Sequence, residues 1–152
     1  MALPASFPET ALPDVEGRVA PLDQAWAHGL ALVILGHRDC KTTRQTLPYV
    51  DRIHRRGGRV LAVLQDDAET ARGLTRELGL ALPLRLEGDP YPLAAALGIG
   101  TVPTLILVEP SGAIAGISEG FGRDDIEAFA ARLGLTPPLF VPEDEAPALK
   151  PG

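Results

Sequence analysis

The sequence lacks several features that mark common classes of protein. Its 152 residues include one cysteine, so no internal disulfide can form and no oxidising compartment is implied. No apolar run approaches the roughly 18 residues expected of a membrane-spanning helix. The opening MALPASFPET has neither the basic nor the apolar region of a secretory signal. We therefore expect a cytoplasmic protein without a membrane partner.

Positive charge is also scarce. The chain has 14 lysines and arginines against 20 aspartates and glutamates, which gives a formal charge of −6. Neutralising nucleic-acid phosphates requires a basic face, so we expect no nucleic-acid partner. The histidines, at positions 28, 37 and 54, lack metal-ligand spacing, and no glycine-rich phosphate loop joins a strand to a helix. We therefore expect neither a metal nor another cofactor.

The sequence does contain alternating strand and helix patterns, which predict an α/β domain. Strands are predicted for the apolar, β-branched runs at 30–35, 59–64 and 104–108, and helices for 42–56, 66–78, 92–97 and 123–133. In the first helix, Leu47, Val50 and Ile53 recur at a spacing of three, and Gly57 follows its end. A hairpin is predicted for 11–22, a short strand for the segment 82–89, and a strand antiparallel to 104–108 for 113–120.

The last part of the chain has a different composition. Residues 137–152 are rich in proline and acidic side chains, and the prolines interrupt regular structure. The apolar run Leu139, Phe140 and Val141 could dock on the body. We expect a domain over 1–136 followed by this tail.

The single thiol stands where anions are stabilised. Cys40 follows the first strong strand and opens the helix, where unpaired N–H groups and the positive end of the helix dipole favour a thiolate. Positive side chains gather nearby and give electrostatic support, while Asp39 opposes it; they are His37, Arg38, Lys41 and Arg44. We predict a partly exposed, reactive cysteine.

Four sequence features in the same order resemble the thioredoxin-like superfamily, in particular its TlpA-type and AhpC/TSA redoxins. They are the LPDVEGRVAPL hairpin, Cys40 at its helix start, Pro48 eight residues later, and the step Val102-Pro103-Thr104 into a strand. The resemblance spans roughly residues 10–133. It implies three layers with a central mixed sheet, helices on both faces and an N-terminal hairpin, and it makes residues 82–99 the redoxin-type insertion.

The resemblance also assigns roles to site residues. It implies that Pro103 is cis and that the backbone of Val102, with Pro103 and Thr104, binds substrate beside the thiol. The C-x-x-C motif is reduced here to Cys40-Lys41-Thr42-Thr43. We predict that the Thr43 hydroxyl donates a hydrogen bond to the Cys40 thiolate, but a hydroxyl cannot resolve a mixed disulfide.

Three functions remain compatible with one cysteine. The protein could be a monothiol thiol-disulfide oxidoreductase that uses an external thiol. It could be a peroxiredoxin-like thiol peroxidase with an antioxidant role, although His37 stands where those proteins have a hydroxyl. It could also be a protein-binding module without catalysis. The expected partners are protein thiols or disulfides, or a low-molecular-weight thiol.

Overall fold

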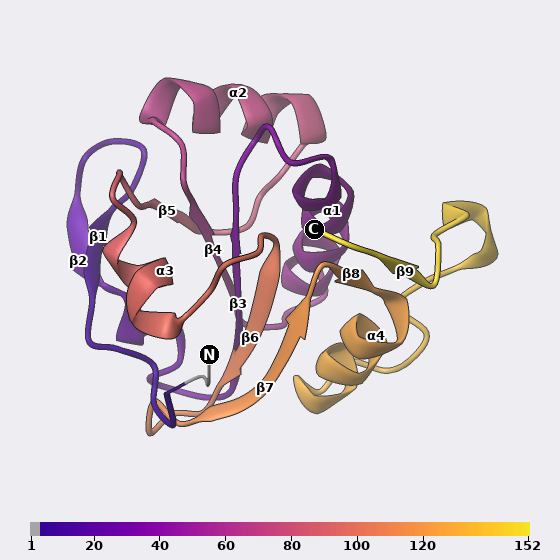
Figure 1. Ribbon diagram of the computed structural model, residues 1–152. Coiled ribbons are helices and arrows are strands. Elements are labelled where there is room, and N and C mark those ends of the chain that lie inside the picture. Colours follow the sequence, from indigo (N-terminus) through magenta and orange to yellow (C-terminus); the bar gives the residue numbers. More distant parts are fainter. Residues whose placement is uncertain (1–3) are drawn as a thin grey trace.

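A five-stranded mixed sheet organises the computed structural model, which describes residues 4–152 (Figure 1). Its strand order is β5-β4-β3-β6-β7. The strands are β3 (Ala31–Gly36), β4 (Val60–Leu64), β5 (Leu84–Leu86), β6 (Thr104–Val108) and β7 (Ile114–Glu119). β3, β4 and β5 run parallel, whereas β6 pairs antiparallel with both β3 and β7. The predicted α/β class and mixed sheet are confirmed.

Each face of the sheet has its own apolar core. Alternate residues of a strand point to opposite faces, so Leu32 and Ile34 join one cluster while Val33 and Leu35 join the other. The first cluster includes side chains of α1 (Lys41–Arg55), α2 (Ala68–Leu78) and α4 (Arg123–Arg132). The second includes α3 (Pro92–Leu97) and the short 3-10 helix η1 (Leu22–Ala25). Helices on both faces give the three predicted layers.

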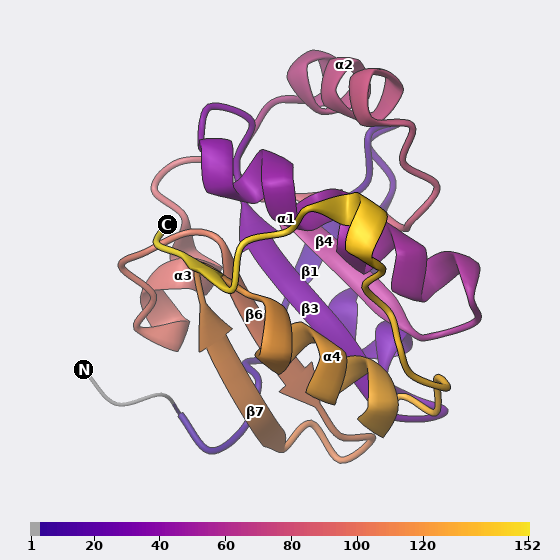
Figure 2. The same ribbon diagram turned by 90° about the vertical axis from the view of Figure 1, so that its right-hand side faces the viewer.

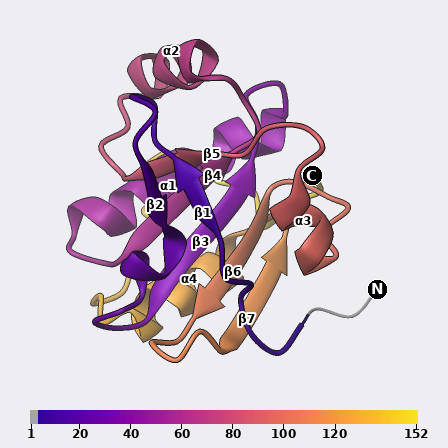
Figure 3. The same ribbon diagram turned by 90° about the vertical axis from the view of Figure 1, so that its left-hand side faces the viewer.

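A two-stranded ribbon precedes the sheet and lies on the same side as α3 (Figure 3). It pairs β1 (Ala11–Pro13) with β2 (Val19–Pro21) in antiparallel register. The Asp14 carboxylate accepts hydrogen bonds from the N–H groups of Glu16 and Arg18. The bond from Arg18 contributes most to lowering the pKa of Asp14. The predicted hairpin is therefore present, closed by a side chain as well as by its glycine.

The predicted helices and strands are present, with ends close to those expected. The helix that follows Cys40 includes Pro48 and is continuous to Arg55. Asp67 caps α2 by accepting the N–H of Thr70, and Gly79 ends that helix in a left-handed conformation. Among residues 4–152, no helix is long and apolar enough to cross a membrane.

The tail has more regular structure than its composition suggests. It contains a 3-10 helix, η2 (Pro142–Asp144), and a strand, β9 (Leu149–Lys150), which pairs antiparallel with β8 (Phe121–Gly122). Leu139 and Phe140 are buried as expected, whereas Val141 is exposed. The Phe140 ring lies 4.4 Å from that of Tyr49 on α1. A domain boundary at residue 136 stays a prediction, because this tail shares the core of the body.

Candidate active site around Cys40

Cys40 is the N-cap residue of α1, as its sequence context predicts. Its backbone is extended, and its Sγ accepts a hydrogen bond from the N–H of Thr43 at 3.4 Å. Helix N-termini leave such N–H groups without intrahelical partners, so the sulfur takes the place of a capping oxygen. The thiol is half-buried. A sulfur in this position lies at the partially positive end of the helix, beside its free N–H groups.

The loop before β6 lies against the same sulfur. The thiol contacts the carbonyl oxygen of Val102 at 3.5 Å, and the peptide bond between Val102 and Pro103 is cis. The loop is fixed from two sides, since Gly120 N–H donates to the Pro103 carbonyl at 2.8 Å and Thr104 Oγ1 donates to Thr101 O at 2.6 Å. Thr104 is buried, so it supports this loop from beneath and does not line its surface.

The expected hydrogen bond from the Thr43 hydroxyl to the sulfur is not formed. The Thr43 side chain is fully buried, and its Oγ1 has no hydrogen-bond partner within residues 4–152. It packs against the Cα of Gly36 at the end of β3, where an added Cβ would lie 2.5 Å from Thr43 Cγ2. The backbone of Thr43 therefore contacts the thiol, while its side chain fills space between helix and sheet.

The basic side chains near Cys40 do not all serve the thiol. Arg44 forms an ion pair with Glu77 on α2, and its hydrogen bond lowers the pKa of Glu77. Arg38 and Lys41 are exposed on the turn and the first helical residue. Electrostatic support from His37, Arg38 and Lys41 stays a prediction, whereas the charge of Arg44 is largely balanced.

An acidic side chain that the sequence analysis did not select borders the same turn. Asp66, just after β4, accepts the backbone N–H of Arg38 at 2.9 Å. Burial raises the pKa of this carboxyl, and the bond from Arg38 opposes that rise. Asp66 thus fixes the turn that leads to Cys40. Its sequence position next to the helix cap Asp67 gave no sign of this contact.

The C-terminal segment also reaches the site, which sequence reasoning missed. Thr42 Oγ1 donates to the carbonyl oxygen of Pro151 at 2.6 Å, although 109 residues separate the two. Gly152 lies against the Val102 carbonyl, because a Cβ added to it would collide with that oxygen. The chain end in Figure 1 accordingly lies over the start of α1. The oxygen that contacts the Cys40 thiol is therefore also covered by this segment.

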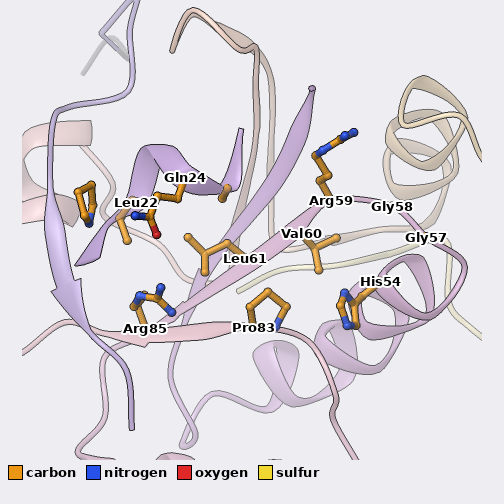
Figure 4. Close-up of a pocket in the computed structure, with 12 residues that line it drawn as sticks. Leu22, Gln24, His54, Gly57, Gly58, Arg59, Val60, Leu61, Pro83 and Arg85 are labelled. Carbon is orange, nitrogen blue, oxygen red and sulfur yellow. The ribbon is translucent and has the colours of Figure 1, made fainter. Parts of the chain in front are cut away.

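Two cavities help to define the extent of the site. One of about 380 Å³ lies beside the Val102 loop, lined in part by His37, Gln65 and Tyr91. The other, of about 450 Å³, lies at the opposite end of the sheet, where β4 begins (Figure 4). It contains no sulfur and does not belong to the thiol site. Within residues 4–152, no cluster of three or more potential ligands could hold a metal.

Comparison with known proteins identifies the fold. No family model and no curated protein matches the sequence. Among solved structures, the thioredoxin domain of a thiol-disulfide oxidoreductase from Bacteroides vulgatus matches with a TM-score of 0.74 and 20% identity, over 86% of this chain and 96% of that one. A thiol:disulfide interchange protein from Chlorobium tepidum matches with a TM-score of 0.69 and 17% identity, over 88% of this chain and 99% of that one.

A third neighbour has a name that indicates a different activity. The peroxidoxin BcpB from Mycobacterium tuberculosis matches with a TM-score of 0.71 and 14% identity, over 88% of this chain and 97% of that one. These neighbours all have the thioredoxin-like fold, so the present chain has that fold as the sequence predicts. Their identities are too low to carry an activity from one chain to another.

Proposed function

We propose that the protein is a monothiol thiol-disulfide oxidoreductase that acts through mixed disulfides at Cys40. The observation that carries the proposal is the hydrogen bond from Thr43 N–H to Sγ at the N-cap of α1. In this proposal Cys40 acts as the thiolate, which is the nucleophile in thiol-disulfide exchange, and the helix end presents an N–H group to it. The thioredoxin-like fold, shared with a thiol-disulfide oxidoreductase and a thiol:disulfide interchange protein, supports the same conclusion.

The first chemical step consumes a partner disulfide. The Cys40 thiolate attacks one sulfur of the partner, the partner's S–S bond breaks, and a mixed disulfide forms with Cys40. The other partner sulfur leaves as a thiolate. The Val102 carbonyl next to Sγ marks the side on which the partner's backbone lies in this proposal.

The second step needs an external thiol, because the chain has no other cysteine. A low-molecular-weight or protein thiolate attacks the sulfur of the first partner, which releases Cys40 as a thiolate and leaves a new disulfide between the two external sulfurs. No net oxidation of the protein occurs over the cycle. Thr43 takes no covalent part, since its hydroxyl is buried against Gly36.

The peroxidase alternative has less structural support. Peroxide reduction requires groups that orient the two oxygens near the sulfur. Within residues 4–152, the hydrogen-bond partners of Sγ are the Thr43 amide and the Val102 carbonyl, and neither is a side-chain hydroxyl. Thr42, the nearest hydroxyl in sequence, donates to Pro151 instead. The proposal therefore favours disulfide exchange over peroxide reduction.

The test follows one sulfur through both steps. The protein is incubated with glutathione disulfide, and intact-mass spectrometry measures the glutathione adduct. Reduced glutathione is then added, and loss of the adduct is followed with time. We expect a single adduct on Cys40 that the thiol removes, and turnover of hydroxyethyl disulfide with glutathione as the reductant.

Two control variants define the result. Cys40→Ser should form no adduct and show no turnover, while Thr43→Val should retain both because it keeps the backbone N–H. An adduct that glutathione cannot remove would contradict a catalytic cycle and favour the binding module. Faster loss of hydrogen peroxide than of hydroxyethyl disulfide would favour the peroxidase.

A further inference from the structure

The final seven residues, 146–152, form a strip beside the thiol. Their strand β9 pairs antiparallel with β8, with Phe121 opposite Lys150 and Gly122 opposite Leu149. The N–H of Arg123 extends this pairing by donating to the Ala148 carbonyl at 2.9 Å. Figure 2 shows the segment, in yellow, crossing α1 on its way to the site. The strip is therefore an extended chain added to a short strand edge.

The strip ends at the Val102 carbonyl, beside the thiol where a substrate binds in the proposed function. The Val102 carbonyl oxygen contacts both the Cys40 thiol and the backbone of Gly152. A Cβ at position 152 would collide with this oxygen and lie 2.8 Å from Thr101 Cγ2. Only a residue without a side chain fits there. The Thr42 hydroxyl fixes the preceding carbonyl, that of Pro151, at 2.6 Å.

The strip is held less firmly than the chain before it. Leu139 and Phe140 are buried, and Arg52 forms a two-pronged ion pair with Asp144 at 2.8 and 2.9 Å. Beyond that anchor, β9 has only two residues, and Leu149 is 78% exposed. Short edge strands with little apolar burial open at low free-energy cost. The strip can therefore leave the site while residues up to Asp144 stay in place.

We propose that residues 146–152 occupy the binding surface for an extended segment of a partner protein, which binds by taking the place of this strip. The partner segment pairs with the β8 edge, presents a carbonyl to Thr42 and places glycine against the Val102 carbonyl. This is β-strand addition, in which backbone hydrogen bonds give affinity and close contacts select the side chains. The inference rests on the proposed function, since it assigns the partner of the same thiol.

Access to the thiol is the quantity that tests this inference. Cys40 alkylation is measured with a small reagent, iodoacetamide, and with a bulky maleimide, and the ratio of the two rates separates access from thiolate reactivity. A chain that lacks residues 146–152 should show a bulky-to-small ratio about tenfold or more above that of the full chain, because a displaced conformer is normally a minor population. An unchanged ratio in a folded truncated chain would overturn the inference.

A peptide supplied separately tests the surface itself. The probe is the heptapeptide Ala-Pro-Ala-Leu-Lys-Pro-Gly, which is the sequence of the strip. Added to the truncated chain, it should return the alkylation ratio to the full-chain value in a saturable manner. The same peptide ending in valine is the matched control and should protect far less, because its side chain meets the Val102 carbonyl. Equal protection by both peptides would contradict the inference.

A full-length variant keeps the test valid if truncation impairs folding. Gly152→Val leaves the β8 pairing in place and introduces the collision at Val102, so it should raise the alkylation ratio. Gly73→Ala on α2, where an added Cβ meets nothing within 4 Å, is the control and should not. Alkylation requires no disulfide substrate. A chain that fails the glutathione assay yet shows the expected ratios would refute the proposed function alone.

Discussion

At the scale of single residues, the thiol is controlled by backbone groups. Sγ accepts the Thr43 amide, and its other contact is the Val102 carbonyl. The side chain that replaces the second cysteine of the motif serves packing instead, between α1 and Gly36. This division explains how threonine can stand at position 43 without changing the N-terminal turn of the helix.

Thr43→Val tests this division. The Thr43 hydroxyl is buried and has no partner among residues 4–152, and a buried unsatisfied polar group costs about 1–3 kcal/mol. Replacement by the similarly shaped valine should raise the free energy of unfolding by about 1 kcal/mol. The rate of Cys40 alkylation by iodoacetamide should not change, because the amide remains. Urea unfolding and alkylation kinetics measure the two quantities.

Thr46→Val is the matched control for that substitution. The Thr46 side chain is equally buried, but its hydroxyl donates to the Thr42 carbonyl at 2.7 Å. Valine at position 46 removes a satisfied hydrogen bond and should give no gain in stability. Slower alkylation of Cys40 in Thr43→Val would show that the Thr43 hydroxyl does act on the sulfur, and a loss of stability would show that this hydroxyl has a hydrogen-bond partner.

At the scale of elements, a charged anchor on α1 helps to attach the tail, beside the bonds that Glu127 accepts from Leu139 and Phe140. Arg52 on α1 donates to both carboxylate oxygens of Asp144 and to the Leu139 carbonyl. Its hydrogen bonds lower the pKa of Asp144 from the ordinary 3.8 to about 2. Because the folded-state pKa lies below the unfolded one, the anchor contributes fully above pH 4 and is lost as the pH falls towards 2.

Arg52→Gln should remove this pH dependence. At pH 7 the variant should lose about 1 kcal/mol of unfolding free energy, as expected for a partly exposed ion pair. Between pH 4 and 2 the free energy of unfolding should fall less steeply in the variant than in the parent protein. Chemical denaturation at a series of pH values measures both. Arg132→Gln, which removes only an exposed bond to the Ala115 carbonyl, should keep the parent slope. If the free energy of unfolding fell equally steeply with pH in Arg52→Gln and in the parent protein, the ion pair would not be the anchor.

At the scale of the whole molecule, burial is concentrated in the middle of the sheet. Every residue of β3, β4 and β6 is buried, whereas the edge strand β5 is largely half-buried and β9 is exposed or half-buried. Amides in fully buried strands exchange through global unfolding, and amides at exposed edges exchange through local opening. The central strands should therefore determine the slowest exchange in the protein.

Hydrogen exchange measured by mass spectrometry tests this decrease in protection from the central strands to the edges. In deuterated buffer, peptides from β3, β4 and β6 should take up deuterium at their backbone amides most slowly. Peptides from β9 should take it up first. Exchange in β9 should precede exchange in the buried segment at Leu139 and Phe140, because the anchor at Asp144 separates them. Protection in β9 as strong as in β3 would mean that the strip does not open independently.

The fold was predictable because its core strands are short, continuous apolar runs with clear helix caps between them. The run from Thr104 to Val108 and the helix from Pro92 to Leu97 agree with prediction at both ends. The position of Cys40 followed from the same pattern, since a strand led directly into a helix. These features depend on neighbours in sequence, where periodicity carries information.

The covering of the site was not predictable, because it depends on contacts between distant residues. Thr42 meets Pro151 across 109 positions, and nothing local to either residue indicates the contact. The two-residue strand β9 is too short to give a period-two pattern. The Thr43 hydroxyl was assigned to the sulfur from spacing alone, whereas its side-chain direction is decided by the space above Gly36.

The position of the last residues has a practical consequence for anyone who fuses the protein to a tag or a reporter. An attachment after Gly152 begins beside the Val102 carbonyl, the oxygen that contacts the reactive sulfur. The amino-terminal side joins the body at Ser6, which bridges to Ala113 in the hairpin at the far end of the sheet. We therefore expect a handle or fluorophore attached after residue 152 to displace the strip and to raise access to the thiol, which would be mistaken for activation.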